Sequence, residues 1–396
     1  MSNSKPRTFV ITGATGLVGS ELAKALLDRG DVLVLLVRGE DVGTAREHVR
    51  TRLSLDDDDM QNVRVVVGDL LSVRTKYEQG DFDDSFSDCP QVAGLIHLAA
   101  DLSFRSRDRE AVFDTNRKGT EQVMWLAKTL DIPLYHVSTA YVHGRRKGVL
   151  KEQELLQAQF NNPYEESKFV TEELLQEEVT HGLKCAIIRP SIVIRRNIPE
   201  NKKTAPFGYY SIVGAVSALK IKLSHLLTKH HWLSAILGIK VEDGGVLRAR
   251  LVPFFVADST LNLVRLPALV ETMMAILDEG TDQPNGIVYH VVDPNPLTMK
   301  KISAIALEEV GLHMPVVVVP HFITQFFFAA VRVASHVIPV LVDLSKKFHY
   351  YGYYMTATYE FDITNTVKLM GKERYTTLFE DQEDYLHNAT RQFLSK

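Results

Sequence analysis

Two side chains with complementary proton chemistry stand four residues apart where a helical pattern begins. Tyr164 and Lys168 share one face of a helix at this spacing. A phenol has a pKa of about 10 and exchanges protons poorly at neutral pH, but a nearby ammonium favours the phenolate and lowers that pKa. The pair is therefore a candidate for general acid–base chemistry. The same spacing is common by chance, so this interpretation depends on the other motifs in the chain.

A further hydroxyl group follows the apolar run 134–137. Ser138 and Thr139 stand at its end, and the carboxyl ends of parallel strands are where open α/β sheets bind ligands. Either hydroxyl could donate to a substrate oxygen beside the tyrosine, and either could simply cap the strand. These residues leave both candidates open.

The segment 12–19 is a candidate phosphate-binding loop between an expected strand and an expected helix. A dinucleotide pyrophosphate needs a tight turn, close backbone approach and a free helix N-terminus. Glycines supply the first two and the helix dipole supplies the third, and the strand–turn–helix context separates the pattern from an ordinary glycine turn. The residues expected to hold the cofactor here are Gly13, Thr15, Gly16, Leu17, Val18 and Gly19.

The residue after the second expected strand distinguishes the two nicotinamide cofactors. An NAD site typically has Asp or Glu at this place, whereas this chain has Arg38. A guanidinium can pair with a 2′-phosphate that a carboxylate would repel. We therefore expect NADPH (or NADP+), with Arg46 as a candidate second contact. The alternative is that Arg38 is an ordinary surface residue.

Short β-rich runs alternate with helical patterns through the first half of the chain, which predicts a parallel sheet with right-handed crossovers. The expected fold is α/β, a Rossmann doubly wound parallel sheet with a smaller, mainly helical C-terminal substrate lobe. Residues 1–190 are expected to bind NADP(H), with 251–280 returning to that domain. Residues 191–250 and 281–396 are expected to form the substrate lobe. Expected strands are 8–12, 32–37, 63–67, 92–98, 134–137 and 184–188, and expected helices are 16–28, 117–130 and 164–181.

Composition limits the classes of function. A formal net charge of −4 over 396 residues argues against nucleic-acid binding. Cys89 and Cys185 give neither a disulfide framework nor metal-ligand spacing, so no metal site is expected. The segment 1–7 lacks an apolar signal-peptide core, which makes a cytoplasmic location the default expectation. The oligomeric state is left open.

The segment 322–342 is largely apolar and close to the length of a membrane span, but it contains Gln325, Arg332, His336 and Pro339. A central arginine costs about 2.5–3.5 kcal/mol on insertion scales. Three interpretations stay open: a buried or substrate-facing helix, a peripheral membrane contact and a true span.

With these motifs in order, the chain resembles the extended short-chain dehydrogenase/reductases. The resemblance implies that Asp69 and Leu70 lie near the adenine, Ala99 and Ala100 along the cofactor, and Pro190 and Ser191 beside the nicotinamide amide. It also favours Thr139 over Ser138. The motifs are Thr-Gly-x-x-Gly-x-x-Gly at 12–19, Gly68-Asp69-Leu70, His97-Leu98-Ala99-Ala100, Asn116-x-x-Gly119-Thr120, Tyr164-x-x-x-Lys168 and Arg189-Pro190-Ser191.

Within that family the chain is most similar to fatty acyl-CoA reductases and thioester reductase domains. Segments 138–146, 99–104, 189–193, 261–264 and 361–366 carry this resemblance, whereas Arg265 and the stretch 196–250 depart from it. It implies NADPH-dependent reduction of a fatty acyl thioester, held by coenzyme A or an acyl-carrier protein, to an aldehyde and onward to an alcohol.

Two other functions use the same residues. One is an NADP-dependent reductase or dehydrogenase of a lipophilic aldehyde, ketone or hydroxysteroid-like small molecule, or of a sugar nucleotide. The other is a non-catalytic NADP-binding scaffold, which the presence of both Tyr164 and Lys168 disfavours. For the thioester, the ten Lys/Arg against three Asp/Glu in 195–250, with Arg145 and Arg146, could meet coenzyme A phosphates or an acidic carrier. A solvated basic face is the simpler alternative.

Overall fold

The computed structural model describes residues 5–86, 89–196, 208–230, 232, 234, 236, 238–279, 285–338 and 341–395. The chain forms two compact units. The first comprises residues 1–191, 266–292 and 361–375, and the second comprises residues 192–265, 293–360 and 376–396.

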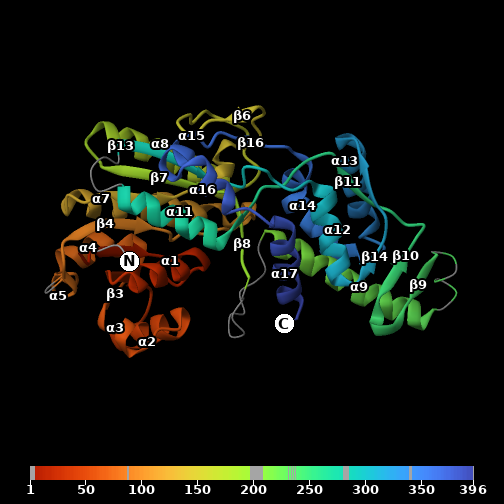
Figure 1. The fold of residues 1–396 in the computed structure, drawn as a ribbon, viewed down its shortest axis with the longest axis horizontal. Helices are drawn as coiled ribbons and strands as arrows, with labels where there is room; N and C mark the ends of the chain where they lie inside the picture. The colour runs from red at the N-terminus through yellow and green to blue at the C-terminus, as the bar shows by residue number, and fades with distance from the viewer. Residues whose placement is uncertain are drawn as a thin grey trace. The chain divides into compact units, whose positions relative to one another are not determined.

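A seven-stranded, wholly parallel sheet forms the centre of the first unit (Figure 1). Its strand order is β13-β7-β5-β4-β1-β2-β3, so the order reverses between β4 and β1. This architecture confirms the expected doubly wound sheet. The strands are β1 (Thr8–Thr12), β2 (Val32–Val37), β3 (Val63–Val67), β4 (Val92–His97), β5 (Leu134–Val137), β7 (Cys185–Pro190) and β13 (Asn285–Val291).

Continuous apolar runs explain the central strands. Every residue of β1 and of β2 is buried, as expected of strands that are covered on both faces. Their bounds coincide with the predicted runs 8–12 and 32–37. The β-branched threonines, valines and isoleucines of these runs favour the extended backbone.

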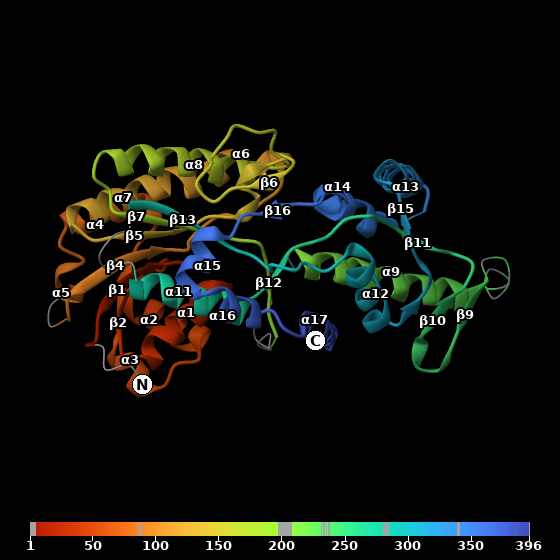
Figure 2. The same cartoon turned by 45° about the horizontal axis from the view of Figure 1, so that its top comes forward.

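Helices cover both faces of this sheet (Figure 2). One layer contains α1, α2, α11 and α15, and the other contains α4, α6, α7 and α8. The helices of the unit are α1 (Leu17–Asp28), α2 (Val42–Leu53), α3 (Asp57–Gln61), α4 (Val73–Glu78), α5 (Asp83–Phe86), α6 (Arg109–Phe113), α7 (Gly119–Thr129), α8 (Pro163–Thr180), α11 (Leu266–Glu279), α15 (Thr364–Met370) and α16 (Lys372–Thr377).

The second unit is mainly helical, as expected of the C-terminal lobe. Its helices are α9 (Tyr209–Lys229), α12 (Met299–Val310), α13 (His321–Ala334), α14 (Val342–Thr356) and α17 (Gln382–Leu394). Its short strands are β8 (Ile192–Ile194), β9 (Ile239–Val241), β10 (Leu247–Ala249), β11 (Phe254–Ala257), β12 (Leu263–Arg265), β14 (Leu312–His313) and β15 (Val316–Val319).

The segment expected to return to the cofactor domain, 251–280, does so only from residue 266 onward. Residues 251–265 belong to the second unit, whereas 266–292 and 361–375 belong to the first. The first return, residues 266–292, packs α11 on α1 and adds β13 to the sheet. The second return, residues 361–375, packs α15 against β13 and α11. The helical and strand patterns of these segments do not specify which unit they join, because that depends on contacts far along the chain.

Tyr375 closes the second return. Its fully buried hydroxyl donates to the carbonyl oxygen of Val292 at 2.6 Å and accepts from the N–H of Val292 at 2.9 Å. Val292 is the last residue of the first return. One phenol therefore satisfies both backbone groups of a residue at which the chain leaves the sheet.

We expect Tyr375→Phe to lower the free energy of unfolding by about 1–3 kcal/mol, because it leaves two buried backbone groups without their partner. Urea denaturation followed by circular dichroism measures this change. The matched control is Tyr350→Phe, since Tyr350 is a half-buried tyrosine on α14. Its free energy of unfolding should stay within about 0.5 kcal/mol of that of the parent. Equal urea midpoints for parent and Tyr375→Phe would contradict the role assigned to this hydroxyl.

Candidate active site

The turn after β1 is so crowded that two of its positions require glycine. Gly13 has a φ of +75°, and a Cβ there would lie 2.5 Å from the backbone nitrogen of Ala99. A Cβ on Gly19 would lie 2.2 Å from the carbonyl oxygen of Gly13. Gly16 begins α1 with extended backbone and contributes no side-chain cap. The backbone of this turn can therefore approach a ligand closely, with the helix N-terminus facing it.

This turn lies at the point where the strand order reverses. β1 has β2 on one side and β4 on the other, and the predicted cofactor residues Ala99 and Ala100 follow β4. The N–H of Ala99 lies 3.4 Å from Oγ1 of Thr12. Open α/β sheets bind ligands at such a switch point, and an uncapped helix N-terminus suits an anion. The residues present therefore fit a dinucleotide pyrophosphate.

The other predicted cofactor residues follow neighbouring strands. The Asp69 carboxylate caps the turn after β3 and accepts from the N–H of Leu71 at 3.0 Å. Leu70 packs near Gly119, where a Cβ would come within 3.1 Å of the leucine side chain. Pro190 ends β7, and the N–H of Ser191 donates to the carbonyl oxygen of Val291. All four predicted residues thus lie at the carboxyl edge of the sheet.

Three arginines belong to the region around the turn. Arg38 follows β2 directly and is exposed. Arg46, the candidate second contact, instead donates to the carbonyl oxygens of Val63 at 2.8 Å and Met60 at 2.6 Å, and so holds α2 against β3. Arg52 was missed by the sequence analysis. Its Nε donates to the Thr15 carbonyl oxygen at 3.1 Å and supports the loop from behind.

The structure brings Thr139 and Tyr164 together. Asn162 caps α8 by accepting from the N–H of Glu165 at 2.9 Å, and Pro163 begins the helix, which places Tyr164 in its first turn. The side chains of Tyr164 and Thr139 are hydrogen-bonded. Ser138 makes no such contact, since its buried Oγ has no partner among the described residues. Of the two candidate hydroxyl groups, Ser138 and Thr139, only that of Thr139 is hydrogen-bonded to Tyr164.

Burial raises the pKa of Tyr164, and the hydrogen bond with Thr139 opposes that change only in part. This direction is the reverse of the one expected from a neighbouring ammonium. The reason is that removing the phenol from water penalises its charged form more than its surroundings favour it. Phe104 contributes to this environment, since its ring stacks on the tyrosine with centroids 6.2 Å apart. Tyr164 is therefore held as a neutral phenol, which is a proton donor.

Lys168 lies one helical turn beyond the tyrosine and is 2% exposed. Its Nζ donates to the carbonyl oxygen of Val137, the last residue of β5, at 2.8 Å. Burial lowers the pKa of Lys168 to about 8, while the Glu172 carboxylate acts in the opposite direction. The ammonium is thus directed at the end of the strand that carries Thr139.

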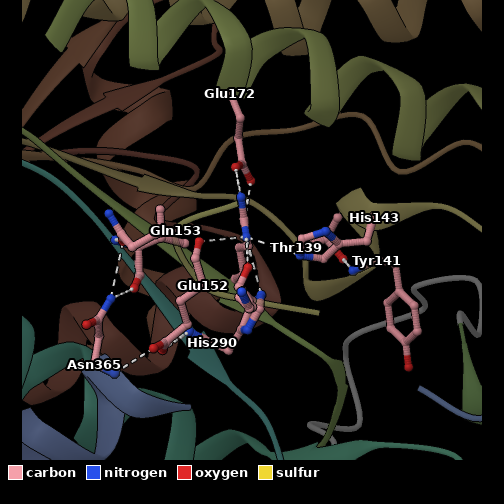
Figure 3. Close-up of polar contacts among 11 residues, drawn as sticks. Thr139, Tyr141, His143, Glu152, Gln153, Glu172, His290 and Asn365 are labelled. Carbon is pink, nitrogen blue, oxygen red and sulfur yellow. Dashed lines mark hydrogen bonds and ion pairs between the residues drawn. The ribbon is translucent and has the colours of Figure 1, made fainter. Parts of the chain in front are cut away.

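A fully buried ion pair lies beneath these residues. Glu172 follows Lys168 by one turn of α8, and its Oε2 accepts from Nη2 of Arg189 at 2.6 Å. Nη1 of Arg189 donates to the Glu152 carbonyl oxygen at 3.0 Å and lies 3.2 Å from Nε2 of His143. Figure 3 shows Glu172, His143, Glu152 and His290 gathered around one centre. The contacts join α8 and β7 to the turn that begins at Thr139.

The two histidines of this cluster are neutral acceptors. Burial, followed by the charge of Arg189, lowers the pKa of His143 to about 2 and that of His290 to about 3. Nδ1 of His290 lies 2.7 Å from the carbonyl oxygen of Asp362, which can only accept, so Nδ1 carries the hydrogen. Nε2 is then left to accept from Arg189, 3.4 Å away.

The carboxylate of Glu152 fastens the segment that returns at 361–375. It accepts from the N–H of His290 on β13 at 2.9 Å and from Oγ1 of Thr366 at 3.0 Å. Burial raises its pKa, whereas these hydrogen bonds act to lower it. The segment 361–366, which the resemblance singled out, is thus a structural clamp on the sheet (Figure 3).

Asn116 lies in a π-helical turn, Asp114–Lys118. Its Oδ1 accepts from the N–H of Asp101 at 2.7 Å, and its Nδ2 donates to the Asp101 carbonyl oxygen and to Oγ of Ser167, each at 2.9 Å. Both amide hydrogens are therefore used. Asn116 ties the loop after β4 to α8, the helix of Tyr164 and Lys168.

Comparison with known proteins identifies the family of this chain. The family model described as male sterility protein, an NAD-binding domain, matches residues 11–235. A carboxylic acid reductase of Mycobacterium marinum is 28% identical over 217 residues, which are 49% of this chain and 18% of the relative. A dihydroflavonol 4-reductase of Gerbera hybrida is 30% identical over 151 residues, which are 37% of this chain and 38% of the relative.

One solved structure has a similar fold over most of both chains. The terminal R domain from the myxalamid PKS-NRPS biosynthetic pathway has a TM-score of 0.68 at 20% identity and covers 94% of this chain and 86% of that one. The chain spans about half or less of the length of the curated relatives it matches. It belongs to the male sterility protein family, within the NAD(P)-dependent oxidoreductases of the extended short-chain dehydrogenase/reductase type.

Proposed function

We propose that this chain reduces a fatty acyl thioester with NADPH and releases an aldehyde. The observation that carries the proposal is the hydrogen-bonded pair Thr139–Tyr164 beside buried Lys168, at the edge of the sheet that holds the glycine turn. The relatives named a carboxylic acid reductase and a PKS-NRPS terminal R domain support an acyl substrate.

NADPH supplies the hydride when bound. Thr139 and Tyr164 donate hydrogen bonds to the carbonyl oxygen and stabilise the negative charge that it gains, because both donors are already in place. Collapse of the resulting hemithioacetal breaks the carbon–sulfur bond and releases the thiol and the aldehyde. In a second reduction, to the alcohol, Tyr164 gives its proton to the aldehyde oxygen. The raised pKa of Tyr164 suits this direction, because a neutral phenol is the acid that reduction needs.

The basic stretch 195–250 lends this proposal less support than its composition indicated. Arg196 lies over the ring of Tyr385 at 4.1 Å, and Arg248 pairs with Glu242 at 2.6 Å. In the first unit, Nε of Arg145 donates to Asn161 at 2.8 Å. Lys202 and Lys203 lie outside the described residues. These contacts do not favour coenzyme A over an acyl-carrier protein as the carrier of the acyl group, and the activity assay below compares the two.

A second candidate is the NADP-dependent reduction of a lipophilic aldehyde, ketone or hydroxysteroid-like substrate. The observation that favours it is the similarity to a dihydroflavonol 4-reductase. The phenyl ring of Phe104 against Tyr164 also suits a flat or apolar substrate. The same donors would serve, since the reaction again adds one hydride and one proton.

The first test is NADPH consumption with acyl-CoAs, acyl-carrier proteins, fatty aldehydes and ketosteroids, with identification of each product. We expect oxidation of NADPH with thioesters and recovery of an aldehyde or alcohol together with the free thiol. Turnover of ketones or aldehydes together with silence toward every thioester would reject the first proposal in favour of the second.

We expect Tyr164→Phe to lower kcat/KM by about 10²–10⁴-fold, because it removes the proton donor. The parent should also lose activity as the pH rises through about 8, where Lys168 loses its charge. Initial rates from pH 6 to 10 measure both effects. Tyr350→Phe, far along the chain on α14, should match the parent. An unchanged rate for Tyr164→Phe would show that this phenol is not the proton donor, whereas absence of turnover in the parent with every substrate would favour the non-catalytic scaffold.

We propose that Arg38 selects NADPH by pairing with its 2′-phosphate. Arg38→Ala should raise KM for NADPH by about tenfold or more, since a hydrogen bond to a charged group contributes about 1.5–3 kcal/mol, and should leave KM for NADH nearly unchanged. Arg74→Ala is the control, because Arg74 is a similarly exposed arginine on α4. Equal increases of KM for both cofactors would show that Arg38 does not read the phosphate.

A further inference from the structure

Helix α13 exposes large apolar side chains along its whole length. Phe322 is 70% exposed, Phe326 is 76% exposed and Val333 is 68% exposed. Val337, just beyond the helix, is 84% exposed. Soluble proteins rarely leave a contiguous apolar patch of this kind in water, and such a patch marks an interaction site. These four residues, with Ala329 between them, are called the α13 stripe below.

The stripe is one side of α13 and lies beside a polar edge formed by exposed His321, Gln325 and Arg332. At about 100° per residue, Phe322, Phe326 and Val333 fall within a sector of about 40°. Thr324 and Val331 lie on the opposite side and are buried. That inner side packs on α14, where Phe328 stacks on Phe348 with ring centroids 4.1 Å apart. Of the two apolar sides of α13, protein therefore covers the inner one and leaves the stripe exposed.

The dimensions of α13 exclude a span. Its 14 residues extend about 21 Å, less than the hydrocarbon core of a bilayer. Helix α9, with 21 residues and a mean hydropathy of 1.2, is long and apolar enough, but it packs against α12, α14 and α17 within its own unit. Of the three interpretations of 322–342, the exposure of the stripe favours a helix that lies in the plane of a membrane surface.

The charge around the stripe is positive. From 312 to 357 the sequence has one acidic residue, Asp343, against Arg332, Lys346 and Lys347. Asp343 is already paired with Lys222 at 2.7 Å. Exposed Arg332 flanks the stripe on the helix itself. Apolar side chains bordered by cations are the pattern of a helix bound to anionic lipid.

We propose that α13 docks the protein on an anionic lipid bilayer, with the stripe at the boundary of headgroups and acyl chains and Arg332 among the headgroups. A second copy of the chain fits this surface less well, because a two-fold interface would bring the same cations together. The proposal goes beyond the proposed reaction and does not depend on it.

Sedimentation of the full chain with sucrose-loaded vesicles tests this. We expect binding to mixed phosphatidylcholine and phosphatidylglycerol vesicles, and weaker binding to phosphatidylcholine alone. Phe322→Ser/Phe326→Ser should lower the partition coefficient at least about tenfold, because each phenyl ring loses its burial in lipid. Arg332→Gln should weaken binding to the mixed vesicles and leave binding to phosphatidylcholine unchanged.

A matched pair of variants separates docking from a general loss of apolar surface. Val333→Ser lies in the stripe, whereas Val42→Ser removes a 55% exposed valine from α2. The first should reduce binding and the second should not, with equal melting temperatures and equal NADPH consumption. Absence of binding to mixed vesicles would overturn the proposal. So would a parent dimer that the double serine variant dissociates, or an acidic carrier protein that competes with the vesicles and alone requires the stripe.

Discussion

The ion pair between Arg189 and Glu172 has no solvent exposure on either side chain. Taking two such charges out of water costs several kcal/mol per ion even after relaxation, so the surroundings must offset that cost through geometry and further hydrogen bonds. Here Nε and Nη2 of the guanidinium both face the carboxylate. Its third nitrogen faces a backbone carbonyl and two imidazoles. Loss of either charge would leave the other buried without a partner.

Because of what it joins, this pair determines the geometry of the site. Glu172 belongs to α8, the helix of Tyr164 and Lys168, and Arg189 belongs to β7 at the centre of the sheet. Through His143 the same guanidinium reaches the turn that begins at Thr139. The buried ion pair therefore links the helix of Tyr164 to the turn of Thr139, and so helps to set the position of the two hydroxyls relative to each other. The proposed reduction would benefit from this, because donors that are already oriented stabilise a developing oxyanion without reorganisation.

The same burial sets the protonation states in a way that spacing could not reveal. The sequence indicated that Lys168 would lower the pKa of Tyr164, but the lysine proton is directed at the Val137 carbonyl and burial of the phenol dominates. Strands β1, β2 and β3, the glycine turn and the Tyr164–Lys168 pair could all be predicted, because local patterns specify them. Arg52, Tyr375 and the carboxylate of Glu152 could not, because their partners lie in distant parts of the chain. The acidic run at 56–59 caps and begins α3, since Asp56 and Asp59 form a capping box.

The first unit is assembled from three separate stretches of the chain. The chain passes between the units after residues 191, 265, 292, 360 and 375. At two of these crossings the first unit holds the backbone directly, because the phenol of Tyr375 bonds both backbone groups of Val292. At another, Ser191 is bonded to β13 immediately after the predicted nicotinamide residue Pro190. Residue 191, at which the chain leaves the first unit, therefore directly follows Pro190, which the resemblance places beside the nicotinamide. The sheet and its buried ion pair hold Tyr164, Lys168 and the turn at Thr139 through contacts within the first unit.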